Sequence, residues 1–351
     1  MTLAEKQSNL NLPGVILGTS ALGNLFVALD GNVKREIIKE YIDHSTDNIV
    51  FDSAGKYGAG LALESLGKYL RELRIAPENV TISNKLGWFR TKLKTPEPMF
   101  EKGVWVGLKH DAVQMISYKG MMTCFEQGNE LLNGYQPEML SVHDPDEYLQ
   151  AAKSIKDEQK RYEEILEAYQ ALADLKANGK IKSVGIGAKD WKTIIRIAKD
   201  VKLDWVMIAN SMTIKSHPSE LLAFMTSLQK ENIPVINSAV FHAGFLIGGN
   251  FYDYKLANED LPGYEILIKW RSDFFETCKD HDVKPAEACV RFALNAPGVR
   301  SVALSTTNPK RIKENLEMSR TVIPDQFWMD LVEKGLVNSS VPFLNSIMRK
   351  N

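Results

Sequence analysis

The sequence predicts a (β/α)8, or TIM, barrel with a long loop after its third strand and extra helices at its C-terminal end. Short β-branched runs alternate along the chain with longer stretches of helical period, which indicates parallel βαβ units. There are eight such runs, the number that closes a barrel. An open doubly wound sheet is the alternative, but no third glycine of a GxGxxG turn follows Gly185 and Gly187.

The expected strands are short apolar runs bounded by polar or turn-forming residues. They are Val15–Leu17, Asn48–Phe51, Val80–Ser83, Met139–Val142, Lys182–Ile186, Trp205–Ala209, Val235–Asn237 and Ser301–Leu304. Helical periods lie between them, as in Tyr162–Lys176, where apolar residues recur on one side until Asn178 and Gly179 end the helix.

The composition predicts one globular domain over residues 1–351 that binds neither nucleic acid nor a membrane. Apolar residues make up 44% and charged residues 25%, and 43 basic residues nearly balance 44 acidic ones. The first residues show no signal-peptide pattern, and no apolar run is long enough to cross a bilayer. The 3 widely spaced cysteines predict neither a disulfide nor a metal site, so we expect a protein of the reducing cytoplasm.

One connection is much longer than its neighbours. About 55 residues separate Ser83 from Met139, roughly twice what one βα unit needs. The excess, about 87–116, is rich in aromatic residues, proline and lysine, and it follows a strand end, where barrel enzymes build their sites. We expect a functional lid in which Trp88 contacts the substrate, and a disordered loop is the alternative.

Three ionisable residues come at the ends of expected strands: Asp52, Lys85 and His143. Because the C-terminal ends of barrel strands converge at one mouth, we expect these side chains to meet. Tyr57 lies shortly after Asp52 in a glycine-containing loop. Taken singly, each of the four could have a purely structural role: a helix cap, an aromatic packed on the rim, a solvated charge or a turn cap.

Together, these four residue types suit proton transfer at a substrate oxygen. A free tyrosine, with a pKa of about 10, is a poor base at neutral pH. A lysine ammonium beside it stabilises the phenolate and lowers that pKa, and a buried carboxylate keeps the lysine charged. With a histidine orienting the substrate oxygen, this is the proton chemistry of carbonyl–alcohol conversion, and the hydride has to come from a cofactor.

The residues resemble those of the aldo-keto reductase superfamily over nearly the whole chain. The segment FDSAGKYGAGLALESLGKYL is similar to that family's D-T-A-x-x-Y-G-x-G-x-x-E-x-x-L-G pattern, with Ser53 in place of threonine. Lys85 after VTISN and His143 after MLSV complete the family's tetrad. The resemblance implies that Tyr57 and Lys85 relay the proton, that Asp52 supports them and that His143 orients the substrate.

Three segments look closer to one branch of the family: VHDPDEYL, the long loop and NSAVFHAGFL. That branch contains the D-threo-aldose 1-dehydrogenases, also called L-fucose or L-galactose dehydrogenases. The resemblance implies oxidation of the anomeric carbon of a free sugar to a lactone, with Tyr57 acting on the C1 hydroxyl. A pyridoxal dehydrogenase or a general aldehyde or ketone reductase is the first alternative. A non-catalytic nucleotide-binding subunit and a cofactor-free isomerase or lyase are the others.

The resemblance also implies an NAD or NADP cofactor. Many members bind the carboxamide with a Ser-Asn pair, which is replaced here by Gly187 and Ala188, so Asn210 is expected to take over that contact. Ser238 stands where an aromatic often stacks on the nicotinamide. The full set of expected cofactor contacts is Gly18, Thr19, Asp52, Asn210, Ser238, Phe241, Ser305, Arg311, Glu314 and Asn315.

The position after the last strand bears on the choice between NAD and NADP. Members that prefer NADP often place a lysine there, and this chain has Ser305. Arg311, Glu314 and Asn315, in RIKEN, match residues on the adenosine side. We therefore expect NAD to be used at least as well as NADP, while the Arg311 guanidinium leaves dual use open.

Overall fold

The structure is a computed structural model that describes residues 10–253 and 255–348. Residues 1–9, part of the segment expected to carry no signal sequence, lie outside the described residues. Within the described ranges, no helix combines the length and the apolar character needed to cross a membrane.

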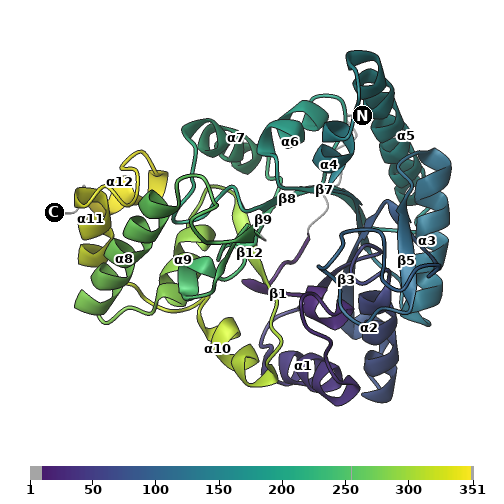
Figure 1. The fold of residues 1–351 in the computed structure, drawn as a ribbon, viewed down its shortest axis with the longest axis horizontal. Coiled ribbons are helices and arrows are strands. Elements are labelled where there is room, and N and C mark those ends of the chain that lie inside the picture. Colours follow the sequence, from purple (N-terminus) through teal and green to yellow (C-terminus); the bar gives the residue numbers. More distant parts are fainter. Residues whose placement is uncertain (1–9, 254, 349–351) are drawn as a thin grey trace, which may run out of the picture.

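Eight parallel strands close into a barrel, and the helices surround it (Figure 1). The order around the barrel is β1-β12-β9-β8-β7-β6-β3-β2. Their bounds are β1 Val15–Gly18, β2 Ile49–Ala54, β3 Val80–Leu86, β6 Met139–His143, β7 Ser183–Ala188, β8 Trp205–Ala209, β9 Val235–Ser238 and β12 Val299–Leu304. All eight expected strands are present, with ends shifted by at most three residues, so the predicted (β/α)8 class is confirmed.

The helices pack against the outside of the strands. They are α1 Gly31–His44, α2 Leu61–Glu72, α3 Tyr118–Leu132, α4 Pro145–Gln150, α5 Ile155–Ala177, α6 Trp191–Ala198, α7 Ser219–Lys230, α8 Tyr264–Asp280, α9 Pro285–Leu294, α10 Ile312–Glu317, α11 Asp325–Glu333 and α12 Pro342–Met348. The helix expected over 162–176 lies within α5, which begins earlier because the Ser154 hydroxyl caps it by accepting from the Asp157 amide at 3.1 Å. The expected extra C-terminal helices are α11 and α12, which lie beside α8 at one edge (Figure 1).

Large side chains fill the barrel interior. Trp205 of β8 is fully buried there, in one cluster with Ile16 of β1, Val50 of β2 and Ile236 of β9. A Cβ at Gly185, on the adjacent β7, would lie 2.2 Å from the Trp205 ring, so this position requires glycine. The barrel is therefore a packed core at this level, and space for a ligand is left only at the ends of the strands.

The long connection after β3 is ordered and projects beyond the barrel. It contains an antiparallel hairpin of β4, Trp88–Lys92, and β5, His110–Gln114. We call residues 87–116 the excursion. Its aromatic residues form a buried cluster that includes Phe100, Trp105 and Ala59 of the β2–α2 loop. The long loop expected after the third strand is therefore present and covers part of the barrel mouth, and its role as a functional lid stays a prediction.

A second, smaller hairpin follows β9, made of β10, Phe251–Tyr252, and β11, Lys255–Leu256. The three cysteines, Cys124, Cys278 and Cys289, are buried with free thiols. Burial raises the pKa of the Cys124 thiol to about 11 and that of Cys278 to about 12. These thiols are thus uncharged core residues at neutral pH.

Candidate active site

The strand ladder brings together the three ionisable residues that the sequence places far apart. Asp52 lies in β2, and Lys85 and His143 lie at the ends of β3 and β6, so each belongs to a strand rather than following one. The register pairs Ala54 with Lys85, and β6 is the next strand on the far side of β3. All three side chains are nearly buried, with exposures of 3%, 3% and 4%.

Asp52 and Lys85 form a buried ion pair. The Lys85 ammonium donates to Asp52 Oδ1 at 2.6 Å and to Oδ2 at 2.5 Å, and the Ser83 hydroxyl donates to Oδ1 at 3.3 Å. The Thr19 hydroxyl, at the end of β1, donates to the Asp52 backbone carbonyl at 3.0 Å. The carboxylate is thereby held by the Lys85 ammonium and the Ser83 hydroxyl, while Thr19 fixes the Asp52 backbone, and the carboxylate charge keeps the ammonium in place.

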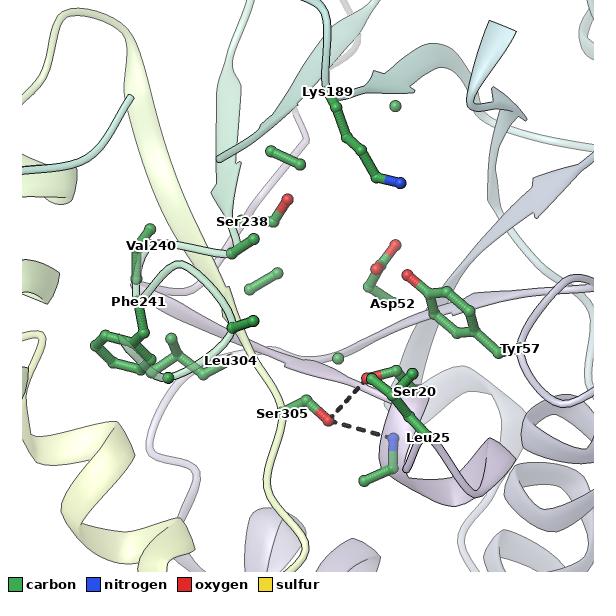
Figure 2. A pocket seen from close by; sticks show the side chains of 18 of the residues that line it. Ser20, Leu25, Asp52, Tyr57, Lys189, Ser238, Val240, Phe241, Leu304 and Ser305 are labelled. Atoms are coloured by element: carbon green, nitrogen blue, oxygen red, sulfur yellow. Dashed lines mark hydrogen bonds between the residues drawn. The ribbon is translucent and has the colours of Figure 1, made fainter. Parts of the chain in front are cut away.

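Tyr57 lies over this pair. The Lys85 nitrogen is 5.0 Å from the centre of the Tyr57 ring. The ring meets His143 edge-on, with centroids 5.5 Å apart, and contacts Trp105 of the excursion at 5.8 Å. Figure 2 shows the Tyr57 hydroxyl and the Asp52 carboxylate directed into the same part of the cavity. The four residues expected to act together thus share one site.

His143 is neutral at physiological pH. Burial, and then the positive charges of Lys56 and Lys85, hold the pKa of its imidazole well below the ordinary value. Its Nδ1 is buried without a hydrogen-bond partner among the described residues. A neutral imidazole in this place can donate one hydrogen bond to a ligand and is not a source of positive charge.

A second cluster of charged residues, which was not expected from the sequence, lies beside Tyr57 and His143. Lys56 is 4% exposed and pairs with Glu101 at 2.8 Å, Glu147 at 2.8 Å and Asp144 at 3.1 Å. Lys189 pairs with Glu147 at 2.5 Å. Burial alone lowers the pKa of the Lys56 ammonium, but these three carboxylates outweigh it and raise that pKa above the ordinary value. Lys56 is therefore charged throughout the physiological range.

A cavity of about 700 Å³ opens at the C-terminal ends of the strands and is lined by residues of both groups, Glu147 excepted. Its wall includes Tyr57, His143 and Lys189, with Phe241 and Leu304 across the cavity from Tyr57 (Figure 2). This volume is in the range of sites that hold cofactors and small ligands. The cavity is lined by groups from separate strand ends, as in the active sites of other barrels.

Six of the ten expected cofactor contacts line this cavity: Gly18, Asp52, Ser238, Phe241, Ser305 and Arg311. The other four are placed elsewhere. Thr19 is buried behind the wall, and Glu314 accepts a hydrogen bond from Lys284. Asn210 and Asn315 also lie outside the lining.

The lining carries groups suited to a nucleotide. The Ser305 hydroxyl lies 3.1 Å from that of Ser20 and 3.4 Å from the Ala21 amide, so hydroxyl and amide donors are gathered at one spot. Arg311 adds a guanidinium, which suits a phosphate. Asn210 Oδ1 is also buried without a hydrogen-bond partner among the described residues, but it lies outside the lining. The lining residues fit a nicotinamide dinucleotide.

The substrate contact expected from Trp88 is not what the geometry favours. Trp88 lies outside the cavity lining and packs against Phe100, with ring centroids 5.8 Å apart. Trp105 lines the cavity instead, beside Tyr57. Two residues of the site, Lys56 and Lys189, were not expected from the sequence, although it held a signal for each. Lys56 directly precedes Tyr57, and Lys189 directly follows the strand β7.

Two contacts bridge the mouth of the cavity through the loop after β1. On one side, Leu25 forms an antiparallel β-bridge with Trp105, and the Phe26 amide donates to the Val104 carbonyl at 2.8 Å. On the other side, the Phe26 ring stacks on Phe251 at 5.4 Å. The loop after β1 therefore links the excursion to the hairpin after β9.

Known proteins share this architecture. Residues 14–335 match the Aldo/keto reductase family. The pyridoxal 4-dehydrogenase of Microbacterium luteolum is 27% identical over 345 residues, which cover 95% of this chain and 96% of that protein. The D-threo-aldose 1-dehydrogenase of a Pseudomonas species is 23% identical over 350 residues, covering 95% and 97%.

Solved structures agree on the fold. The holo form of the aldo-keto reductase AKR11C1 from Bacillus halodurans superposes with a TM-score of 0.65 at 17% identity, covering 93% of each chain. The glycerol dehydrogenase AKR11B4 from Gluconobacter oxydans gives a TM-score of 0.67 at 17% identity, covering 91% of this chain and 90% of that one. The family match spans most of the chain. It includes the buried ion pair, Tyr57 and His143. The chain therefore belongs to the aldo/keto reductase family and is an NAD(P)-dependent oxidoreductase.

Proposed function

We propose that this enzyme oxidises the C1 hydroxyl of a cyclic hemiacetal, in the first instance a free L-fucose-like aldose, to a lactone. The observation that carries the proposal is the placement of Tyr57 over the buried Asp52–Lys85 pair and beside His143, at the wall of a cavity with several polar groups. That group is suited to taking a proton from a hydroxyl whose carbon loses a hydride.

The residues divide the proton chemistry among them. The Tyr57 oxygen accepts the proton of the substrate hydroxyl, and the Lys85 ammonium stabilises the phenolate form that does so. Asp52 keeps the ammonium charged and in place. Neutral His143 donates a hydrogen bond to the same substrate oxygen, and so holds it toward Tyr57. A bound nicotinamide supplies the hydride acceptor, which no side chain can replace.

We propose that the enzyme uses NAD at least as well as NADP. Ser305 stands where a lysine would meet a 2′-phosphate, and it brings a hydroxyl rather than a charge to the cavity wall. The exposed Arg311 is the one cationic group near that position among our expected contacts, and it suits a phosphate. This arrangement supports a slight preference for NAD, with NADP still accepted.

Pyridoxal is the second candidate substrate, because the Microbacterium relative is named a pyridoxal 4-dehydrogenase. The two candidates share one chemistry. A free aldose closes on itself through a ring hydroxyl, and pyridoxal can close in the same way through the hydroxymethyl group beside its aldehyde. Both then present a carbon that carries hydrogen, a hydroxyl and a ring oxygen, and oxidation of that carbon yields a lactone.

The test is a substrate panel with NAD and with NADP, followed by formation of the reduced cofactor, and for the aryl aldehyde also with NADH and NADPH, followed by consumption of the reduced cofactor. It contains L-fucose, L-galactose, D-arabinose, D-glucose, pyridoxal and an aryl aldehyde, and the lactone product is identified by mass spectrometry. We expect turnover of sugars that share the L-fucose stereochemistry. Turnover of pyridoxal alone would move the assignment to the second candidate, and activity confined to the aryl aldehyde, in the reductive direction, would refute hemiacetal oxidation.

The matched control is Tyr57→Phe, which removes one oxygen and leaves the ring contacts with Trp105 and His143. We expect it to bind the cofactor as the native enzyme does and to lose about 10²–10⁴-fold in turnover, the usual contribution of a general acid–base group. Native turnover in this variant would show that the proton goes elsewhere.

A further inference from the structure

The cavity wall next to Tyr57 carries buried charged side chains that have no part in the proposed proton transfer. Lys56 and Asp144 line the wall with side chains 4% and 9% exposed, and Glu101 and Lys189 line it too. Burying charged groups is costly unless each is paired, and here they are paired with one another. A wall built in this way presents fixed hydrogen-bond acceptors and donors to whatever fills the cavity.

Glu101 and Trp105 act as one unit on the excursion side of this wall. The Trp105 indole nitrogen donates to Glu101 Oε2 at 2.7 Å, and Glu101 Oε1 pairs with the Lys56 ammonium at 2.8 Å. The Trp105 ring lies 5.8 Å from the Tyr57 ring. Each carboxylate oxygen can accept more than one hydrogen bond, so Glu101 keeps acceptor capacity toward the cavity.

Lys189 lines the same wall and shares the Glu147 carboxylate with Lys56. It follows β7, and Figure 2 shows its side chain extending toward the space that the Tyr57 hydroxyl and Asp52 face. Its ammonium donates to Glu147 at 2.5 Å, and an ammonium has three donor hydrogens. The space beside Tyr57 is therefore lined by a carboxylate next to an indole and by an ammonium.

This combination matches a particular chemical class. Ring hydroxyls can donate to a carboxylate and accept from an ammonium, while the C–H faces of a sugar ring can pack on an indole. The two ammonium groups of this wall, Lys56 and Lys189, are already matched by carboxylates, so the wall offers an anionic ligand little net attraction. An apolar aldehyde would displace water from these groups without replacing its hydrogen bonds, which is unfavourable.

We propose that Glu101, Trp105 and Lys189 form a subsite for the ring hydroxyls of an uncharged polyhydroxy substrate, with Lys56 holding Glu101 in position. This inference rests on the proposed oxidation of a hemiacetal and names what the rest of the substrate must carry. It assigns substrate selection to residues separate from the proton-transfer group.

The experiment compares a hemiacetal that carries the ring hydroxyls assigned to this subsite with one that lacks them. One is L-fucose, and the other is tetrahydropyranol, the six-membered cyclic hemiacetal without further ring hydroxyls. Values of kcat/KM are measured for the native enzyme and for Glu101→Gln and Lys189→Met. The matched controls are Glu97→Gln, on the same excursion, and Lys192→Met, on α6; both residues are exposed and outside the cavity lining.

We expect each subsite variant to lower kcat/KM for L-fucose about 10- to 100-fold, the usual cost of losing a hydrogen bond to a charged group. The value for tetrahydropyranol should change less than about threefold, and both control variants should behave as the native enzyme does. Equal losses on the two hemiacetals would overturn the proposal, since the residues would then act on the reaction itself. Unchanged L-fucose kinetics would overturn it as well.

Failure of the proposed function can be told apart from failure of the subsite. If the native enzyme oxidises tetrahydropyranol but no sugar, hemiacetal oxidation stands and the subsite is wrong. If it oxidises neither, the proposed function is wrong, and titration calorimetry of L-fucose into the NAD+-loaded protein decides the subsite. Binding that is lost in Glu101→Gln and Lys189→Met supports it, and absence of binding refutes it.

Discussion

Replacing Asp52 by asparagine removes the only carboxylate that the described residues bring within ion-pair distance of the Lys85 ammonium. The two charged groups are 2.5 Å apart, and their side chains are 4% and 3% exposed. Breaking a buried pair by removing one partner costs about 3–5 kcal/mol, because the remaining charge is left without compensation. Asparagine keeps one acceptor oxygen, so we expect Asp52→Asn to lose about 3 kcal/mol of unfolding free energy.

The second variant, Lys85→Met, leaves the carboxylate with the Ser83 hydroxyl at 3.3 Å as its remaining side-chain partner. We expect a loss of similar size. The double variant contains neither charge, so its loss should be close to that of one single variant. The coupling energy should therefore be about 3 kcal/mol, the upper range for residues in direct contact.

The assay is urea unfolding of the cofactor-free protein, followed by tryptophan fluorescence and by circular dichroism to check that the two transitions coincide. The matched control is the exposed pair Lys39–Asp43, which has the same 2.5 Å separation but exposures of 39% and 49%. Its coupling energy should stay below about 1 kcal/mol. Additive losses in Asp52→Asn and Lys85→Met would refute the reasoning, because the pair would then contribute no more than its separate members.

Three further predictions follow from other parts of the structure. Gly185→Ala places a Cβ 2.2 Å from the Trp205 ring, so thermal unfolding should show a loss of about 2 kcal/mol that Trp205→Phe partly restores. Burial, together with nearby carboxylates, raises the pKa of the Asp146 carboxyl to about 6 from an ordinary 3.8, so the stability that its protonated form contributes is lost as pH rises through 6. Asp146→Asn should therefore gain up to about 3 kcal/mol relative to the native protein between pH 4 and pH 7, and a pH-independent difference would contradict this. Phe26→Ala removes the stack on Phe251 and should raise the cofactor dissociation rate several-fold in stopped-flow measurements, whereas an unchanged rate would show that the stack does not retain it.

The sequence was most informative where one physical rule controls the outcome. Each barrel strand is a short, buried, β-branched run, so all eight could be found without knowing their neighbours. Because the C-terminal ends of parallel strands meet at one mouth, the positions of Asp52, Lys85 and His143 were enough to predict that they share a site. Their pairing distances and the buried state of the ion pair needed the structure.

The excursion shows where sequence reasoning stops. Two tryptophans, Trp88 and Trp105, are both in this segment, and its backbone pairings decide which of them reaches the cavity. Trp88 pairs with Gln114 in the ladder and turns toward Phe100, whereas Trp105 is brought to Tyr57 by its bridge with Leu25. These contacts depend on segments far apart in the chain, which local periodicity does not encode.

The charged group around Lys56 escaped prediction for a related reason. The loop sequence alone predicts that Lys56 is a surface lysine. The three carboxylates that form ion pairs with it come from two other segments of the chain. Burial of such a residue becomes visible only when those segments are assembled. The signal available in the sequence was that Lys56 directly precedes Tyr57 and Asp144 directly follows His143.

The two charged groups sit on parts of the fold with different freedom to change. Asp52, Lys85 and His143 belong to strands whose backbones are fixed by neighbours on both sides, so an insertion there would disrupt the barrel. Glu101 and Trp105 belong to the excursion, whose length and sequence can drift without altering a single barrel hydrogen bond. Mutations in the excursion can therefore change substrate specificity while the reaction is retained. Descendants of such a chain can differ in substrate before they differ in reaction type.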